Sequence, residues 1–404
     1  MIATLAPTPA PSLLAQKDGI LRPAEADPAR LEAYLPSPCV QNHAANIMPL
    51  PGGDLACVWF GGTQEGIPDI SVYFSRLAAG DERWSDAVRL SDDAARSEQN
   101  PILFPAPDGL LWLLWTAQVS GNQDTAIVRR RVSADNGRSW GEIETLFDTV
   151  GRSGVFVRQP PAVLDNGDIL LPIFYCHGRP GEKWVGSYDT SAVRISADGG
   201  RTWREHEVPH STGCVHMDVS QLVDSTLLAL FRSRWADNIH SSRSNDRGRT
   251  WSAPIATDLR NNNSSIQSTR LANGHLALLF NDTNAEGVVE RRASLYDDIE
   301  DDSGLKEPDA KPGERQAVWG VPRAPLTLAL SEDGGRSWPR KRNLEVGDGY
   351  CMTNNSREQL NREYSYPSIK QGPDGALHIA FTYFRQAIKY VRVAEDWVGH
   401  GDDR

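Results

Sequence analysis

Apolar runs that follow a polar turn recur six times along this 404-residue chain. In each copy, Gly, Asp or Asn residues lead into five to eight apolar residues, a pattern typical of a buried strand entered from a hairpin. Successive runs begin 56, 58, 58, 49 and 101 residues apart, at Leu55, Leu111, Ile169, Leu227, Leu276 and Leu377. Intervals near fifty residues suit four-stranded blades, so the pattern predicts an all-β, six-bladed β-propeller. The long last interval predicts an acidic surface insertion at about residues 285–320.

A second repeat consists of four nearly identical octets, each running from a serine to a tryptophan. In every octet an Asp two residues after the Ser can accept backbone N–H groups of its own turn, and a Gly tolerates positive φ. None of these groups needs a substrate, so we interpret the octets as structural hairpins. They are Ser133–Trp140, Ser196–Trp203, Ser244–Trp251 and Ser331–Trp338.

Composition narrows the possible partners and the domain organisation. A net charge of −11 leaves no basic stripe for nucleic acid, and no apolar run is long enough for a membrane span. Residues 39–398 are predicted to form one propeller, with residues 399–404 as a tail. Residues 1–38 form an extension in which the segment around Gly19 to Pro23 is expected to supply the outer strand of the last blade. A weak signal-peptide pattern and five scattered cysteines favour the cytoplasm.

Propeller geometry predicts which residues surround the central channel. The loops entering each first strand and leaving each second strand open on one face, whereas the octets lie on the other. Counting back eleven to thirteen residues from each apolar run therefore gives six short segments that meet at the axis. They contain Asn42 to Ala44, Glu98 to Asn100, Phe156 to Arg158, Cys214 to His216, Asn263 to Ser265 and Tyr364 to Tyr366. Such a concentration of His, Asn, Arg, Ser and Tyr predicts a polar site.

The octet is the Asp-box, or BNR repeat, and the chain resembles the sialidase superfamily of β-propellers. That resemblance implies an arginine cluster for a substrate carboxylate, a tyrosine nucleophile and an Asp acid/base. Leu230 to Arg234 matches the context of the second arginine, with Arg232 better placed than Arg234, while Arg323 matches the third arginine and Asp69 the acid/base. The nucleophile falls on Tyr364 or Tyr366. Propeller geometry, independently of the resemblance, adds four candidates for substrate binding, namely Arg158, Asn100, Ser265 and Arg385.

Two positions depart from the sialidase pattern. Gln41-Asn-His43 stands where the first arginine is expected, and Val215-His216 replaces the glutamate that assists the tyrosine. Histidine, tyrosine and arginine together suit β-elimination beside a uronate, because arginine neutralises the carboxylate while His or Tyr transfers protons. The chain also resembles, more loosely, propeller lyases that act on rhamnose-capped glucuronate.

Three functions follow from these candidates. The first is an exo-acting enzyme that cleaves a glycosidic bond at an acidic sugar by β-elimination, with His43, His216 and a tyrosine as catalytic groups. The alternative is a sialidase-like retaining hydrolase that uses Asp69 and Tyr364 or Tyr366. A non-catalytic carbohydrate-binding propeller is the third, since fold does not fix function. The expected partner is an acidic oligosaccharide, and neither a cofactor nor a metal is predicted.

Overall fold

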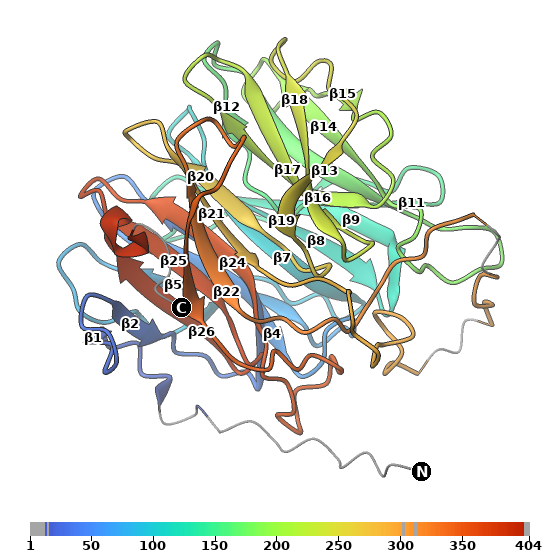
Figure 1. Cartoon of the computed structure of the whole chain (residues 1–404), viewed down its shortest axis with the longest axis horizontal. Helices are drawn as coiled ribbons and strands as arrows, with labels where there is room; N and C mark the ends of the chain where they lie inside the picture. Colours follow the sequence, from blue (N-terminus) through green and yellow to red (C-terminus); the bar gives the residue numbers. More distant parts are fainter. Residues whose placement is uncertain (1–12, 14–15, 301–303, 310–312, 400–404) are drawn as a thin grey trace.

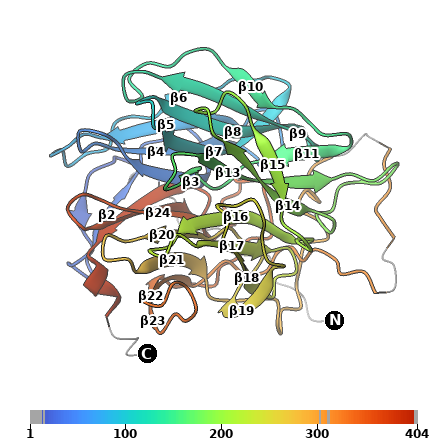
Figure 2. The ribbon, with the colours of Figure 1, turned by 90° about the horizontal axis from the view of Figure 1, so that it is seen from above.

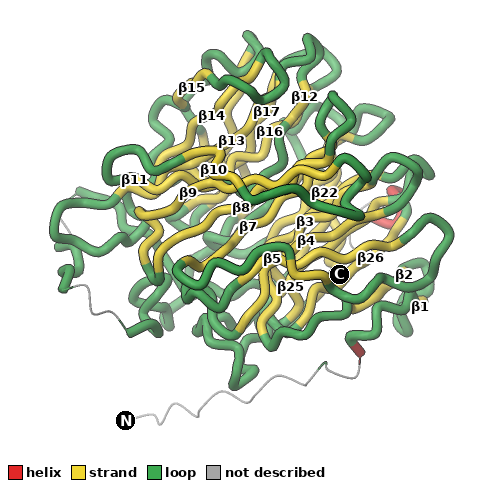
Figure 3. Tube along the Cα trace, turned by 180° about the vertical axis from the view of Figure 1, so that it is seen from behind, coloured by secondary structure: helices red, strands yellow, loops and turns green. Residues whose placement is uncertain are grey.

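The computed structural model describes residue 13 and residues 16–300, 304–309 and 313–399, and it consists almost entirely of strands and loops (Figure 3). Six antiparallel sheets are arranged around a common axis as a propeller (Figure 1). The predicted all-β, six-bladed propeller with Asp-box hairpins is confirmed. Within the described residues, no helix is long and apolar enough to cross a membrane.

The first three blades are built from consecutive strands, and β12 adds to the edge of the third blade beside β13. Figure 2 shows β3 and β7 towards the middle of the molecule and β10 at its periphery. Blade one contains β3 (Gln41–Pro49), β4 (Leu55–Gly62), β5 (Ser71–Leu77) and β6 (Val88–Arg89). Blade two contains β7 (Arg96–Pro105), β8 (Leu111–Val119), β9 (Asn122–Ser133) and β10 (Glu144–Phe147). Blade three contains β11 (Ser153–Phe156), β12 (Ala162–Val163), β13 (Ile169–His177), β14 (Thr190–Ser196) and β15 (Arg204–Glu207).

The last three blades repeat this order, and the sixth also takes strands from the N-terminal segment. Blade four contains β16 (Cys214–Gln221), β17 (Leu227–Ser233), β18 (Asn238–Ser244) and β19 (Ile255–Arg260). Blade five contains β20 (Gln267–Arg270), β21 (Leu276–Asn281), β22 (Leu326–Ser331) and β23 (Arg340–Glu345). Blade six contains β24 (Tyr364–Gln371), β25 (Leu377–Tyr383), β26 (Ala387–Val393), β2 (Leu31–Tyr34) and β1 (Arg22–Pro23), and the short 3₁₀ helix η2 (Glu395–Val398) follows it.

Each predicted apolar run is the second strand of its blade. Strands β4, β8, β13, β17, β21 and β25 begin at the six residues from which the spacing was counted. These strands are almost completely buried, which explains why they are continuously apolar instead of alternating. The spacing of the predicted hairpins therefore located the second strand of each blade correctly.

The propeller is closed by the N-terminal segment. Strand β2 pairs antiparallel with β26 over Leu31 to Tyr34, and β1 pairs with the outer side of β2 (Figure 1). The direct partner of β26 is thus Leu31–Tyr34 instead of the segment around Gly19 to Pro23, which lies one strand further out. Blade six therefore joins an N-terminal strand to the C-terminal strands of the ring.

The hydrophobic core is divided among the interfaces between blades. Six clusters of buried apolar residues each combine side chains from two adjacent blades, including the contact between blade six and blade one. A blade therefore buries both of its faces only when a neighbour stands on each side.

The Asp-boxes form the hairpins between the third and fourth strands of blades two to five. In the box of blade three, Ser196 ends β14, and its Oγ accepts the N–H of Gly200 at 2.8 Å and donates to Asp198 at 2.8 Å. The Asp198 carboxylate accepts the backbone N–H of Thr202 at 2.9 Å and its hydroxyl at 2.6 Å. The same bonds recur in the other three boxes. The octets are thus self-contained turns.

The box glycines also determine how closely neighbouring blades approach. Gly200 has φ of 85°, and a Cβ placed on it would lie 2.1 Å from the ring of Trp112 in the preceding blade. Glycines at the same box position pack in the same way against the preceding blade, at Gly137, Gly248 and Gly335. Glycine is therefore required at this position both by the backbone conformation and by the contact between blades.

The described parts of residues 282–325, between β21 and β22, form an insertion that packs against blades two and three. Tyr296 accepts hydrogen bonds from the side chains of Gln118 and Gln123 in blade two, both at 2.9 Å. Trp319 donates its indole N–H to the carbonyl of Val185 in blade three at 3.3 Å. These contacts fix the insertion to blades two and three.

Gly200→Ala tests the contact between blades, with Gly167→Ala as a matched control. Both glycines have φ of 85° in blade three, but a Cβ at Gly167 would meet no atom within 4 Å. Both substitutions incur the left-handed strain of about 1–2 kcal/mol, and Gly200→Ala should cost about 1–3 kcal/mol more through overpacking. Urea unfolding measures both variants. Equal losses would show that the glycine is needed only for its φ.

Candidate active site

The inner strands of four blades are interrupted by a β-bulge at equivalent positions near the axis. Strand register shifts in β3, β7, β16 and β24, just where polar residues of the predicted ring occur. The bulged residues have left-handed backbone conformations, with φ of 60° at Ala44, 51° at Asn100, 53° at His216 and 50° at Tyr366. Non-glycine residues in this region cost on the order of 1–3 kcal/mol and concentrate at functional sites. The repeated strain marks the axis as the candidate site.

Tyr366 lies at the centre of this arrangement. Three guanidinium groups surround its ring, with their carbons 5.3 Å (Arg158), 5.6 Å (Arg232) and 5.5 Å (Arg323) from the ring centroid. Arg232 also donates a hydrogen bond of 2.6 Å from Nη1 to the Tyr366 hydroxyl. Arg232 therefore lies where it would stabilise negative charge on the phenolic oxygen.

His43 packs against one side of Tyr366. Their ring centroids are 4.2 Å apart, and Nδ1 of His43 shares a hydrogen bond of 2.8 Å with the Thr382 hydroxyl. Its Nε2 is buried and has no hydrogen-bond partner in the described part of the chain. Burial, reinforced by Arg385 and the other nearby arginines, lowers the pKa of His43 well below its ordinary value. The His43 imidazole is therefore uncharged at neutral pH.

His216 lies on another side of the tyrosine, with ring centroids 5.7 Å apart. Its Nδ1 shares a hydrogen bond of 3.1 Å with Ser265, and its Nε2 lies 3.3 Å from Nη1 of Arg232. Burial, followed by the charge of Arg232, lowers the pKa of His216 well below the ordinary value. An arginine N–H beside Nε2 requires an unprotonated nitrogen there, which agrees with a neutral ring.

Two carboxylates hold the other arginines of the centre. Glu363 accepts a hydrogen bond of 2.6 Å from Arg323 and another from Arg385, while Glu65 accepts one of 2.6 Å from Arg385. Although burial alone raises the pKa of Glu363, the two arginines lower it to about 2. Glu363 is therefore ionised throughout the physiological range and neutralises part of the local charge.

Arg158 and Arg232 have no such partner. Both side chains are about 1% exposed, and no carboxylate of the described residues forms an ion pair with either of them. Arg158 bonds instead to Ser265 at 3.1 Å and to backbone carbonyls, and its Nη1 has no partner within the described chain. Burial lowers the pKa of each guanidinium to about 10. Two buried guanidinium groups beside Tyr366 therefore lack a compensating carboxylate among the described residues.

The structure brings together seven of the predicted site residues. They are His43, Arg158, His216, Arg232, Ser265, Arg323 and Tyr366. Arg385 lies beside them, between Glu363 and Glu65. Asn100 is buried in the β7 bulge.

Three predicted residues make their contacts elsewhere. Arg234 forms a buried ion pair of 2.7 Å with Asp189, so its charge is compensated. The Tyr364 hydroxyl donates to the carbonyl of Val346 at 3.1 Å, and its ring packs among the aromatic residues of blade six. Asp69 is exposed, and its carboxylate accepts the N–H and hydroxyl of Thr63.

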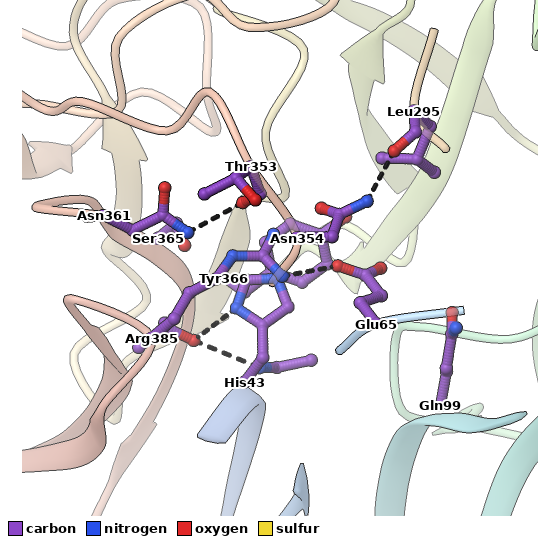
Figure 4. Close-up of polar contacts among 12 residues, drawn as sticks. His43, Glu65, Gln99, Leu295, Thr353, Asn354, Asn361, Ser365, Tyr366 and Arg385 are labelled. Carbon is purple, nitrogen blue, oxygen red and sulfur yellow. Dashed lines mark hydrogen bonds and ion pairs between the residues drawn. The ribbon is translucent and has the colours of Figure 1, made fainter. Parts of the chain in front are cut away.

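Glu65 and Glu363 were missed as site residues. Figure 4 shows Arg385 reaching Glu65 beside His43 and Tyr366. Glu65 belongs to the loop from which Asp69 was chosen, and Glu363 directly precedes the tyrosine pair. In the sequence, each of these glutamates could be noticed only because it lies close to a predicted buried strand. The fold shows that both bind Arg385. Within residues 16–300, 304–309 and 313–399, no group of three or more His, Cys, Asp or Glu side chains could hold a metal ion.

Comparison with known proteins agrees with this architecture. Residues 53–379 match the BNR repeat-like domain. A search of curated proteins gives no significant match to the sequence. Among solved structures, the Hadza microbial sialidase Hz136 superimposes with a TM-score of 0.64 at 14% identity, over 89% of this chain and 66% of that sialidase.

Two further structures share the fold. A protein of unknown function from Dyadobacter fermentans gives a TM-score of 0.65 at 14% identity and covers 92% of this chain and 98% of its own. A K499G mutant of the NanB sialidase from Streptococcus pneumoniae gives 0.64 at 11% identity, over 90% of this chain and 70% of that one. The chain therefore belongs to the BNR repeat-like domain family and has the β-propeller fold of the sialidase superfamily.

Proposed function

We propose that this protein is an exo-acting enzyme that cleaves a glycosidic bond next to a carboxylate-bearing sugar by β-elimination. The observation that carries the proposal is the pair of buried arginines, Arg158 and Arg232, that lack a carboxylate partner in the described chain beside Tyr366. A uronate carboxylate would supply the missing negative charge. Its binding would also offset the cost of keeping two guanidinium groups out of water.

The remaining groups suit the proton transfers of elimination. In this reaction the C5–H bond next to the carboxylate breaks, its electron pair forms the C4=C5 double bond, and the C4–O bond breaks as the leaving oxygen gains a proton. Arginine beside the carboxylate acidifies C5. His43 takes that proton on its unpartnered Nε2, and the Tyr366 hydroxyl supplies a proton to the leaving oxygen.

The insertion supports attack at a chain end. Its residues Tyr296 and Trp319 are fixed to blades two and three, and Asp298 accepts a hydrogen bond of 2.9 Å from Gln64 in blade one. Contacts of the insertion with three blades favour a terminal sugar over the interior of a polysaccharide as the substrate.

A retaining hydrolase is the second candidate. Tyr366 has the arginine surroundings that a tyrosine nucleophile would need, and solved sialidases share the fold. In that reaction His216 would assist Tyr366, and Asp69 would have to leave its bonds to Thr63 to act as acid/base. Elimination does not require Asp69 to leave Thr63, so it is the function that we favour.

Product masses distinguish the two reactions. The protein is incubated with acidic oligosaccharides that include rhamnose-capped glucuronate and sialylated glycans, and the products are weighed by mass spectrometry. Elimination yields fragments that sum to the substrate, one of them an unsaturated uronate. Fragments that sum to substrate plus water would establish hydrolysis instead. No cleavage of any member of the panel would favour the binding propeller.

The Tyr366→Phe variant tests the acid, and Tyr364→Phe is its matched control. Removal of a general acid should lower kcat by about 10²–10⁴-fold. Tyr364 loses only its bond to Val346, so its variant should keep kcat within about threefold of the wild type, since it contacts no reacting group. Steady-state kinetics on the best substrate measures both variants. Similar losses in the two variants would remove Tyr366 from the chemistry.

The pH dependence of kcat/KM tests the role of His43. A base is active when unprotonated, and its lowered pKa keeps His43 neutral until the pH falls well below 6.5. The acidic limb of kcat/KM, which reports the free enzyme, should therefore lie below pH 6.5. His43→Gln should abolish most activity. An acidic limb at or above pH 6.5 would contradict a buried neutral base.

A further inference from the structure

Three consecutive asparagines, Asn261 to Asn263, connect the insertion to the arginine beside Tyr366. Asn261 accepts the N–H of Ser233, the residue after Arg232, at 3.0 Å. Asn262 donates to the carbonyl of Pro322 at 2.8 Å, within the insertion. All three side chains are buried, with exposed fractions of 2% or less. The loop therefore joins blade four to the returning end of the insertion.

Asn263 makes both connections with a single side chain. Its Nδ2 donates to the carbonyl of Val318 in the insertion at 2.8 Å, and its Oδ1 accepts the Nε–H of Arg232 at 2.7 Å. Asn263 has φ of 58°, the conformation of the bulged residues in the other blades. A side-chain amide can donate to a carbonyl through its nitrogen and accept from a guanidinium through its oxygen at the same time. Asn263 therefore combines a left-handed backbone conformation with a side chain that bonds both the insertion and Arg232.

Trp319 supports the same arginine from a second side. Its ring lies 5.8 Å from the guanidinium carbon of Arg232 and 5.0 Å from that of Arg234. The N–H of Val318 also donates to the Arg234 carbonyl at 2.8 Å. Arg232 is thus enclosed by Val318, Trp319, Asn263 and Tyr366, although Val318 lies 86 residues beyond it in sequence.

We propose that Asn263 is a positioning residue through which the insertion holds Arg232, still uncompensated, against Tyr366. An aspartate of the same shape would also hold Arg232, but it would neutralise the charge intended for the substrate carboxylate. The amide therefore serves orientation without competing with the ligand. This proposal rests on the proposed function of the site and adds that the insertion is part of its machinery.

The test compares Asn263→Asp with Asn262→Asp. Both replace an amide with a carboxylate in the same buried loop and break one bond to the insertion, but only residue 263 contacts Arg232. Asn263→Asp should raise KM for the acidic substrate by about tenfold or more, because it pairs with the arginine that binds the carboxylate. Asn262→Asp should change KM by less than about threefold. Equal effects of the two variants on KM would overturn the proposal.

Two further measurements separate failure of this proposal from failure of the proposed function. Titration calorimetry with free glucuronate follows binding without turnover, and Asn263→Asp should weaken it while Asn262→Asp does not. A crystal structure of Asn263→Ala, which adds no charge, should show Arg232 displaced from the Tyr366 hydroxyl. An unmoved Arg232 would refute positioning by Asn263 even if the wild type cleaves glycans. A displaced Arg232 in a protein that neither binds nor cleaves acidic glycans would refute only the proposed function.

Discussion

Apolar contact between adjacent blades is the interaction on which every other feature of this protein depends. No blade has a core of its own, because its buried side chains belong to clusters shared with the blade before and the blade after. The first and last blades can bury their outward faces only if they pack against each other and close the ring. The pairing of β2 with β26 joins these two blades. Ring closure then places six inner strands around one axis, and the site exists only where they meet.

The channel at the axis is lined by strands of several blades, so one arginine can bond to backbone carbonyls of more than one blade. Arg158 reaches from blade three to the carbonyls of Ala45 and Tyr366 in blades one and six, so one side chain spans the axis. Arg158 and Arg232 are buried away from water. Among the arginines that contact Tyr366 or Glu363, those that form an ion pair with a carboxylate of the described residues are Arg323 and Arg385. The apolar ring therefore stabilises an electrostatic imbalance at its centre, which a ligand can relieve.

The spacing of the repeats was sufficient to predict some residues of the candidate site and insufficient for others. His43, His216 and Tyr366 were identified because propeller spacing assigns equivalent positions to them, and the bulges lie at those positions. The same spacing gave no reason to prefer Tyr366 over Tyr364. The β-bulge at Tyr366 decides which of the two rings faces the axis, and the spacing does not locate that bulge. Likewise, Glu65 and Asp69 lie on one loop, and their exposure depends on how that loop folds against Arg385 and Thr63.

The sequence by itself determined the number of blades, the interior strands and the turns that connect them. Those features arise from local chemistry, namely apolar runs, turn residues and glycines at fixed intervals. Only the tertiary structure decided that β2 completes blade six, that Arg234 is neutralised by Asp189 while Arg232 is not, and that the insertion reaches Asn263. Each of these depends on contacts between residues far apart in the chain, whose geometry no local pattern encodes.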